Sequence, residues 1–306
     1  MRGQQDDGIH SHANYSAIGA CAAIASVRRL TAAQFLDALS AAFTFSIAGP
    51  RSHMLKGALV RNTWPAVGAW AGMMSVEWAQ CGIAGLAESG YDALCVALHA
   101  TAFPQRLTTD LGVDWAILDG YTKIYACCQH THSAAEAALE MRGLLAHEAT
   151  AVNDIVVAAH PLALKLKGKI PATSLAAKFS LPHVVAAALT FGDVGARSFY
   201  SDTLQHPAIA ALRNKIQVIP YVPTLPPPND RPARVTVNLV DGRTLSAECL
   251  SAAGGPDRPF SEGIVMDKIS QLSASAYPRF VSEMRRVIDL EEMQLARGWR
   301  EVVSAF

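Results

Sequence analysis

The chain has 306 residues, with 26 basic and 26 acidic side chains, so its formal net charge is zero. Proteins that bind nucleic acids or anionic membrane surfaces normally carry a basic excess or a basic stripe, and this sequence has neither. Hydrophobic residues make up 51% of the chain and charged residues 17%, which indicates much apolar surface buried in a core or against another chain.

The sequence predicts no transmembrane helix. The first apolar run, 15–27, is too short to cross a membrane, and Glu77 interrupts the next candidate. The first ten residues carry two aspartates in place of the basic start of a signal peptide. The six cysteines show no disulfide framework, and Cys127 and Cys128 are neighbours. We therefore expect a cytoplasmic protein with reduced thiols, and no nucleic acid or membrane as a partner.

The first half of the chain is predicted to be helical. Residues 15–30 are Ala-rich and apolar on nearly every side, which predicts a helix buried all round. Thr31 and Gln34 form a capping-box pattern, so a second helix should begin there and end near Gly49. Pro65 suits the first turn of a third helix. Two further helices are expected, after residue 90 and from His132 onward.

The middle of the chain predicts a small sheet. The clearest sign is a β-hairpin, with alternating apolar positions over 234–240, the turn pair Asp241-Gly242, and a second run over 244–250. The same region is expected to contain strands at 154–158 and 215–219 and a helix at 182–189. From residue 261 the helical pattern resumes and continues to the C-terminus.

This order of elements predicts a mainly α protein with an α+β insert. We expect a large all-helical domain and a small α+β lid domain. The predicted boundaries are 1–149 for the helical domain, 150–258 for the lid domain, and 259–306 for C-terminal helices that pack back on the helical domain.

The segment from Thr122 to Ala137 carries the most chemistry. A lysine, two cysteines and two histidines come directly before an Ala-rich helix, at Lys123, Cys127, Cys128, His130 and His132. Cationic and titratable groups at a helix N-terminus suit a carboxylate ligand, because the backbone N–H groups and the positive dipole end act in the same direction. The spacing matches no common zinc pattern such as C-x-x-C. We expect no metal here, with a metal site as the minor alternative.

Five segments in series carry a family resemblance. They are the loop and Ala-rich helix from Gly8-Ile-His10 onward, the segment around Lys56, the segment Lys123-Ile-Tyr-Ala-Cys-Cys with His132, the segment Ala177-Lys-Phe-Ser-Leu-Pro182, and the run from Val235 to Gly242. Together they resemble the MmgE/PrpD family, which includes 2-methylcitrate dehydratase, cis-aconitate decarboxylase and iminodisuccinate epimerase.

The resemblance implies cofactor-free chemistry on a small di- or tricarboxylate, in a site between the helical and lid domains. On the matching positions, His10, His132 and Lys123 would be catalytic, and Lys56 and Lys123 would bind substrate carboxylates. Histidine suits proton transfer near neutral pH, and lysine supplies a point charge for a carboxylate. We therefore expect a lyase or isomerase of the dehydratase or epimerase type. The plainer alternatives are a surface histidine at residue 10, a solvated lysine at 56 and a helix cap at 132.

The chain departs from the family pattern in ways that bear on its partners. Family members carry a long helical segment, with a second catalytic histidine loop, before the position where this chain begins. Cys128 stands where the decarboxylases have histidine, and Ala126 replaces the usual proline. We expect either a homo-oligomer or a second polypeptide that supplies the missing N-terminal half, because residues 15–30 would otherwise expose an apolar face. The alternative is a non-catalytic accessory or remnant protein that binds a partner chain or a carboxylate ligand.

Overall fold

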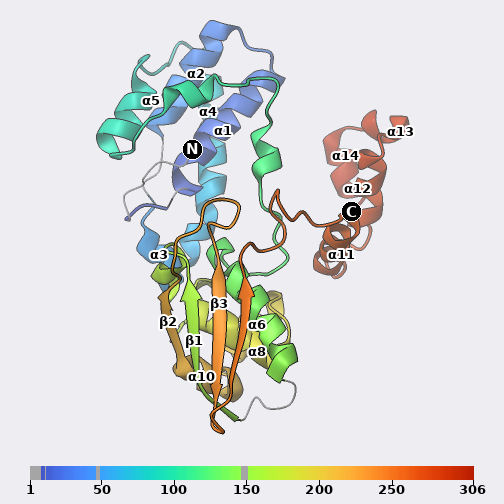
Figure 1. The fold of residues 1–306 in the computed structure, drawn as a ribbon. Helices are drawn as coiled ribbons and strands as arrows, with labels where there is room; N and C mark the ends of the chain where they lie inside the picture. Colours follow the sequence, from blue (N-terminus) through green and yellow to red (C-terminus); the bar gives the residue numbers. More distant parts are fainter. Residues whose placement is uncertain (1–7, 11, 46–48, 146–150) are drawn as a thin grey trace.

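The computed structural model describes residues 8–10, 12–45, 49–145 and 151–306. It is mainly helical and contains one four-stranded mixed sheet, in agreement with the predicted class. Figure 1 shows the N-terminal helices at one end of the molecule and the sheet at the other. A membrane-spanning helix is absent from the described part of the chain.

The first half of the chain folds largely into helices, as predicted, but the first of them is not buried all round, because Gly19 and Val27 are exposed. The helices are α1 (His12–Val27), α2 (Ala32–Thr44), α3 (Arg51–Lys56), α4 (Trp64–Gln80) and α5 (Ser89–Tyr91), which a π-helical turn (Asp92–Ala97) extends. Helices α1, α2 and α4 enclose a small core of Cys21, Ala25, Ala38, Ala42, Val76 and Ala79. Small residues let α1 and α4 approach closely, because a Cβ on Gly72 would lie 2.3 Å from the Ala17 carbonyl oxygen.

The start of α2 is predicted correctly and its end is not. The Gln34 N–H donates to Thr31 Oγ1 at 3.3 Å, and the Thr31 N–H donates to Gln34 Oε1 at 3.1 Å, which completes the capping box. The helix ends at Thr44, before the predicted stop near Gly49. There the Thr44 hydroxyl donates back to the Ala41 carbonyl at 2.7 Å, and Phe45 leaves the helical conformation.

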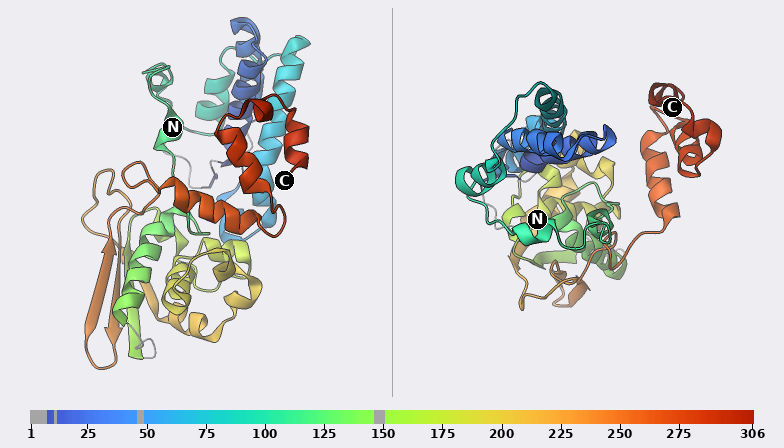
Figure 2. Two further views of the ribbon diagram at one scale, coloured as in Figure 1. Left: turned by 90° about the vertical axis from the view of Figure 1, so that its right-hand side faces the viewer. Right: turned by 90° about the horizontal axis from the view of Figure 1, so that it is seen from above.

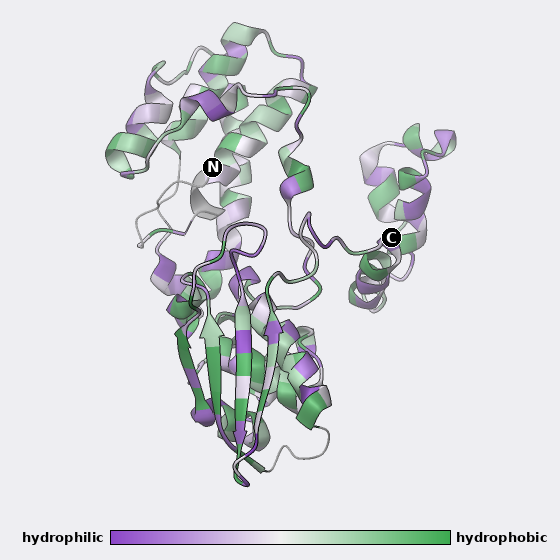
Figure 3. Ribbon diagram, viewed as in Figure 1, coloured by the Kyte–Doolittle hydropathy of each residue, from purple (hydrophilic) through white to green (hydrophobic). Residues whose placement is uncertain are grey.

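The sheet has the strand order β2-β1-β3-β4. Its strands are β1 (Val152–Ala159), β2 (Ile216–Pro220), β3 (Ala233–Leu239) and β4 (Thr244–Cys249). Strands β1 and β2 are parallel, and the other two pairs are antiparallel. The β3–β4 hairpin confirms the alternating pattern of the sequence, and Figure 3 shows hydrophilic and hydrophobic positions alternating along β3. Gly242 takes the left-handed conformation (φ +89°) that the hairpin turn needs.

Helices cover one face of the sheet (Figures 1 and 2). They are α6 (His132–Leu145), α8 (Leu181–Phe191) and α10 (Pro207–Lys215), with the short helices α7 (Ser174–Lys178) and α9 (Ser201–Leu204) nearby. The largest buried side chains of this core include Phe199, Met141, Ile155 and Leu181. Helix α6, which falls within the predicted segment 1–149, therefore shares its core with the sheet, while the domain boundaries themselves stay a prediction.

Four helices follow the hairpin: α11 (Glu262–Ser273), α12 (Phe280–Ile288), α13 (Glu292–Leu295) and α14 (Trp299–Ser304). Figures 1 and 2 show them to one side of the rest of the chain. The Phe280 and Phe306 rings pack edge to face at 4.8 Å within this group. The ammonium group of Lys268 in α11 donates a hydrogen bond to the Lys123 carbonyl. The predicted packing of 259–306 on the helical domain stays a prediction.

Short 3₁₀ helices complete the secondary structure. They are η1 (Leu59–Thr63), η3 (Pro104–Leu107), η4 (Ala116–Asp119), η5 (Gln129–Thr131), η7 (Ala163–Leu166) and η8 (Ala196–Phe199). The most consequential is η5, because it lies directly before α6 and inside the segment that the sequence marks as chemically richest.

Candidate active site

The loop that precedes α6 is anchored to three separate segments. The backbone N–H groups of Thr122, Ala126 and Cys128 donate to the carbonyls of Gly254, Val194 and Lys178, at distances of 2.8 to 2.9 Å. Such bonds satisfy backbone groups that a buried loop would otherwise leave without partners. The loop is therefore held in one position relative to the sheet, and its side chains have a defined place.

His132, the first residue of α6, is a buried neutral imidazole. Its side chain is only 1% exposed. Burial lowers its pKa to about 4, and the charge of Lys123 acts in the same direction, while a hydrogen bond at the Cys127 backbone opposes them. Its Nε2 atom is buried and has no hydrogen-bond partner among the described residues. A neutral ring with an unused nitrogen can accept a proton, as a general base must.

Lys123 is exposed and lies within electrostatic reach of His132. Its charge also counteracts the rise that burial imposes on the pKa of the Cys128 thiol. Two of the predicted site residues, Lys123 in this loop and His132 at the start of α6, thus lie in one neighbourhood. A lysine ammonium group beside a neutral imidazole suits a ligand that has a carboxylate and loses a proton from the carbon next to it. The lysine would bind the carboxylate, and the imidazole would accept the proton.

Arg61 links His10 to the loop that carries Lys123 and Cys128. The guanidinium Nη2 of Arg61 lies 3.5 Å from His10 Nε2, and the His10 ring packs at 6.0 Å from Trp64. Arg61 is in turn close enough to Cys128 to counteract the raised pKa of that thiol. The hydrogen bond and ring contact described for His10 involve Arg61 and Trp64 and not Lys123 or His132. Their convergence on one concave site stays a prediction.

Lys56 lies apart from these contacts. It is the last residue of α3 and is exposed. The following residue, Gly57, ends the helix in the left-handed conformation (φ +76°) and packs against Thr173. Within the described residues no hydrogen bond or ion pair joins Lys56 to the loop before α6. Its substrate-binding role stays a prediction.

His130 belongs to the same neighbourhood, although the sequence suggested only a minor metal role for it. Its ring packs at 5.5 Å from the ring of His160, and the His160 Nε2–H donates to the His130 carbonyl at 3.1 Å. Burial lowers the pKa of His130 to about 3, with further contributions from His160, Arg231, Lys123 and Arg51. The ring is therefore neutral at physiological pH.

Arg51 and Arg231 are cations of this site that the sequence did not reveal. Arg51 opens α3, and its Nη2 atom donates to the Ile9 carbonyl at 3.5 Å. The Arg231 guanidinium lies over the Tyr121 ring at 5.2 Å, and its Nε atom is 3.8 Å from Asp230. No local motif marks either arginine, because each acts on His130 from a segment distant in sequence.

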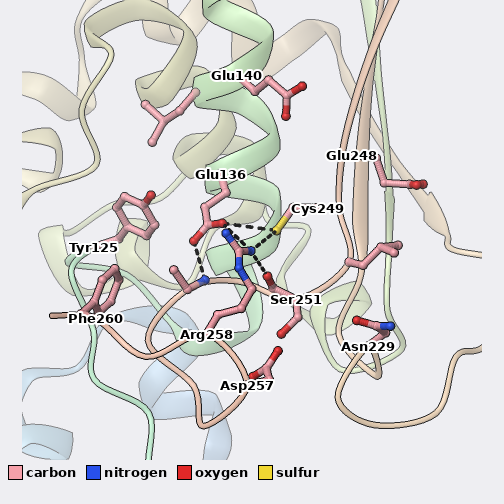
Figure 4. A pocket seen from close by; sticks show the side chains of 13 residues that line it. Tyr125, Glu136, Glu140, Asn229, Glu248, Cys249, Ser251, Asp257, Arg258 and Phe260 are labelled. Carbon is pink, nitrogen blue, oxygen red and sulfur yellow. Dashed lines mark hydrogen bonds and ion pairs between the residues drawn. The ribbon is translucent and has the colours of Figure 1, made fainter.

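A separate cavity of about 590 Å³ lies between α6, β4 and the loop after β4 (Figure 4). The Glu136 carboxylate joins several segments of the cavity wall. It accepts hydrogen bonds from the Ala253 N–H at 2.7 Å, from Arg258 Nη1 at 3.3 Å and from the Cys249 thiol at 3.4 Å. Tyr125 also lines the cavity. The four side chains predicted as site residues are not part of this lining.

The sequence left a metal site as the minor alternative for the segment before α6. Among the residues that the structure describes, no group of three or more histidine, cysteine, aspartate or glutamate side chains is arranged to hold a metal ion.

Residues 125–292 match the family model of the MmgE/PrpD C-terminal domain. This match covers more than half of the chain. The chain belongs to the MmgE/PrpD family. The resemblance read from the sequence is thereby confirmed. The MmgE/PrpD match includes His130, His132 and Arg231, whereas His10, Lys56 and Lys123 precede it. No curated protein matches the chain.

Proposed function

We propose that this MmgE/PrpD protein is a cofactor-free lyase or isomerase, of the dehydratase or epimerase type, that acts on a small di- or tricarboxylate. Membership of a family of dehydratases and isomerases supports the reaction class. The observation that carries the proposal is the buried neutral ring of His132, with an unused Nε2 atom, beside the charge of Lys123.

In the proposed reaction, Lys123 binds a substrate carboxylate. The positive charge stabilises the electron density that builds up when a proton leaves the neighbouring carbon. His132 is neutral and accepts that proton at Nε2, so the C–H bond breaks and an N–H bond forms. In an epimerisation the proton returns to the opposite face of the carbon. In a dehydration a hydroxyl group accepts a proton and leaves as water.

The second proton-transfer group is proposed to be His10. Its ring lies beside Arg61, which is itself close to Cys128, so His10 approaches the loop from a segment far from α6 in sequence. Lys56 is proposed to bind a second carboxylate of the substrate. Its exposed position at the end of α3 allows the side chain to move toward a bound ligand.

The proposal includes a partner chain. Helix α4 exposes a row of large apolar side chains, with Val67 45%, Trp70 57% and Met73 39% exposed. Contiguous apolar surface of this kind marks an association site in soluble proteins. We propose that the chain works either as a homo-oligomer or with a second polypeptide that adds helices to this face.

Solvent hydrogen exchange tests the function across a panel of candidate substrates. Hydroxy-di- and tricarboxylates are incubated with the protein in D₂O, and deuterium at the carbon next to the carboxylate is followed by NMR. Dehydration and epimerisation both begin with loss of this proton, so either activity gives exchange. We expect exchange with the parent chain and none with His132→Gln, while the control His206→Gln, at a ring that packs on Phe191, keeps it.

One outcome supports the non-catalytic alternative. If carboxylates bind but no compound of the panel exchanges, alone or with a partner chain present, the protein is a binding or accessory member of the family and not an enzyme.

A further inference from the structure

The cavity beside Glu136 has the size of a ligand site. Its volume is about 590 Å³, and residues of α6, β4 and the loop after β4 line it (Figure 4). Pockets for small molecules usually have volumes of about 300–1,000 Å³. The lining contains none of the four residues proposed for the carboxylate reaction, so a ligand here would differ from that substrate.

Acidic side chains dominate the polar part of this lining. Glu136 and Glu248 each have a cationic partner, because Glu136 lies 3.3 Å from Arg258 and Glu248 lies 2.6 Å from Arg234. These two pairs cancel much of their own charge. Arg258, which also lines the cavity, therefore does not offset the remaining carboxylates.

Glu140 and Asp257 are the carboxylates of the lining that stay uncompensated. Both are exposed, and within the described part of the chain neither has a hydrogen bond or an ion pair. Glu140 comes from α6 and Asp257 from the loop after β4, and Figure 4 shows them at opposite ends of the labelled side chains. Two separated negative charges suit a ligand with a positive group at each end.

The Ser251 hydroxyl points to a ligand independently of these charges. Ser251 lines the cavity and is only 6% exposed. Its Oγ atom is buried and has no hydrogen-bond partner among the described residues, and Figure 4 shows the side chain directed toward Asp257. A buried hydroxyl without a partner costs free energy, and an ammonium N–H can donate to its oxygen.

Apolar side chains form the rest of the lining. Tyr125, Leu139, Leu250 and Phe260 contribute to it. The Phe260 ring is held by close packing, since a Cβ on Gly254 would lie 2.7 Å from it. Aromatic rings attract cations, and apolar side chains shield a hydrocarbon chain from water.

We propose that this cavity binds a small aliphatic diamine. One ammonium group lies at Asp257 and donates to Ser251 Oγ, the other lies at Glu140, and the carbon chain packs on the apolar side chains. The proposed reaction is not needed for this inference, because the two sites take ligands of opposite charge and share no proposed ligand-binding residue.

An NMR titration with hexamethylenediamine tests the inference at about pH 7, where alkylamines are charged like lysine. The backbone signals of Glu140, Ser251 and Asp257 should shift with ligand concentration, which gives both the place and the dissociation constant. Hexylamine and hexanediol have the same carbon chain with one charge and none. We expect the diamine to bind at least about twofold more tightly than hexylamine, and hexanediol to bind most weakly. Added salt should weaken the diamine complex.

Substitutions identify the groups that bind. Glu140→Gln and Asp257→Asn should each weaken diamine binding by about two- to fivefold. Ser251→Ala should weaken it by about two- to tenfold, and this change removes a hydroxyl without a partner, so folding is not impaired. Glu88→Gln is the matched control, because Glu88 is exposed, makes no cap hydrogen bond at α5 and is not part of the lining.

The contrary results are equally definite. If hexamethylenediamine does not bind, or hexanediol binds as tightly, the inference is overturned and the carboxylate reaction is unaffected. Equal affinities for the diamine and hexylamine overturn the two-ended site. Binding that is unchanged by Glu140→Gln, Asp257→Asn and Ser251→Ala also overturns the inference, because the ligand then lies elsewhere.

Discussion

The Tyr125 ring meets the His132 ring edge to face, with 5.3 Å between the ring centroids. Tyr125 also lines the cavity that Glu136 organises. Burial and the nearby Glu136 carboxylate raise the pKa of Tyr125 to about 12, so its hydroxyl stays protonated. The neutral phenol of Tyr125 thus packs on the neutral imidazole of His132. Tyr125 therefore connects the candidate general base with the cavity.

The neutral state of His132 predicts a pH dependence of stability. Its pKa falls from 6.5 to about 4 on folding, so between these values the unfolded chain binds a proton that the folded chain does not. Stability is therefore lost as pH falls from about 6.5 to 4, by about 3 kcal/mol from this residue alone. Urea unfolding at a series of pH values should show a smaller loss in His132→Gln. An identical pH dependence in both proteins would contradict a neutral buried His132.

The role of Glu136 is tested by a pair of substitutions one helical turn apart. Glu136→Ala removes the acceptor of the Ala253 N–H and the partner of Arg258, so we expect a loss of about 2 kcal/mol. Glu140 lines the same cavity but is exposed, and Glu140→Ala should change stability by less than about 0.5 kcal/mol. Equal effects of the two changes in urea unfolding would show that the Glu136 contacts contribute nothing.

Local signals in the sequence predict local structure well. They do not show which distant segments pack together, and site residues brought in by such packing were therefore missed. The capping pair Thr31 and Gln34 and the Asp241-Gly242 turn each specify their element within a few residues. Lys123, in the loop before α6, and His132, at the start of α6, are nine positions apart, so their proximity also follows from the sequence. The sequence does not mark Arg51 and Arg231 as site residues, because only the packing of α3 and of the sheet region brings their charges close enough to act on His130. Tertiary contacts of this kind produce no periodic pattern in the sequence.

The close approach of α1 and α4 predicts opposite effects for two glycines. A Cβ at Gly72 would lie 2.3 Å from the Ala17 carbonyl oxygen and 2.8 Å from the Cys21 nitrogen, both backbone atoms. Gly72→Ala must push the helices apart, at a cost of about 2 kcal/mol or more. Gly19 is exposed on α1 with nothing within 4 Å of the added Cβ, so Gly19→Ala should stabilise by about 0.5–1 kcal/mol. Thermal unfolding of both variants is the measurement, and a neutral Gly72→Ala would refute this packing.

The proposed role of Lys123 predicts that a carboxylate ligand stabilises the folded chain and that this stabilisation depends on the lysine charge. Tricarballylate should raise the melting temperature of the parent chain, because a ligand that binds only the folded state stabilises it by mass action. Lys123→Ala should lower the affinity by about tenfold or more, since a charge-assisted contact of about 1.5–3 kcal/mol is lost. The control is Lys167→Ala, an exposed lysine beyond η7. The shift should survive a chelator, and equal shifts in both variants would remove Lys123 from the carboxylate site.

The exposed face of α4 predicts that the chain associates with another polypeptide. Trp70 is the largest side chain of the row that also holds Val67 and Met73, and burying it in an interface would remove a large apolar area from water. Light scattering at micromolar concentration should show a species larger than one chain, and Trp70→Glu should shift it toward the monomer without loss of helical signal. Leu144→Glu, at an exposed apolar position on α6, is the matched control and should leave the size unchanged. If the parent chain is a monomer that exchanges substrate protons alone, the association is refuted. If it is a monomer that becomes active only with a separate helical polypeptide, the partner is that chain and not a second copy.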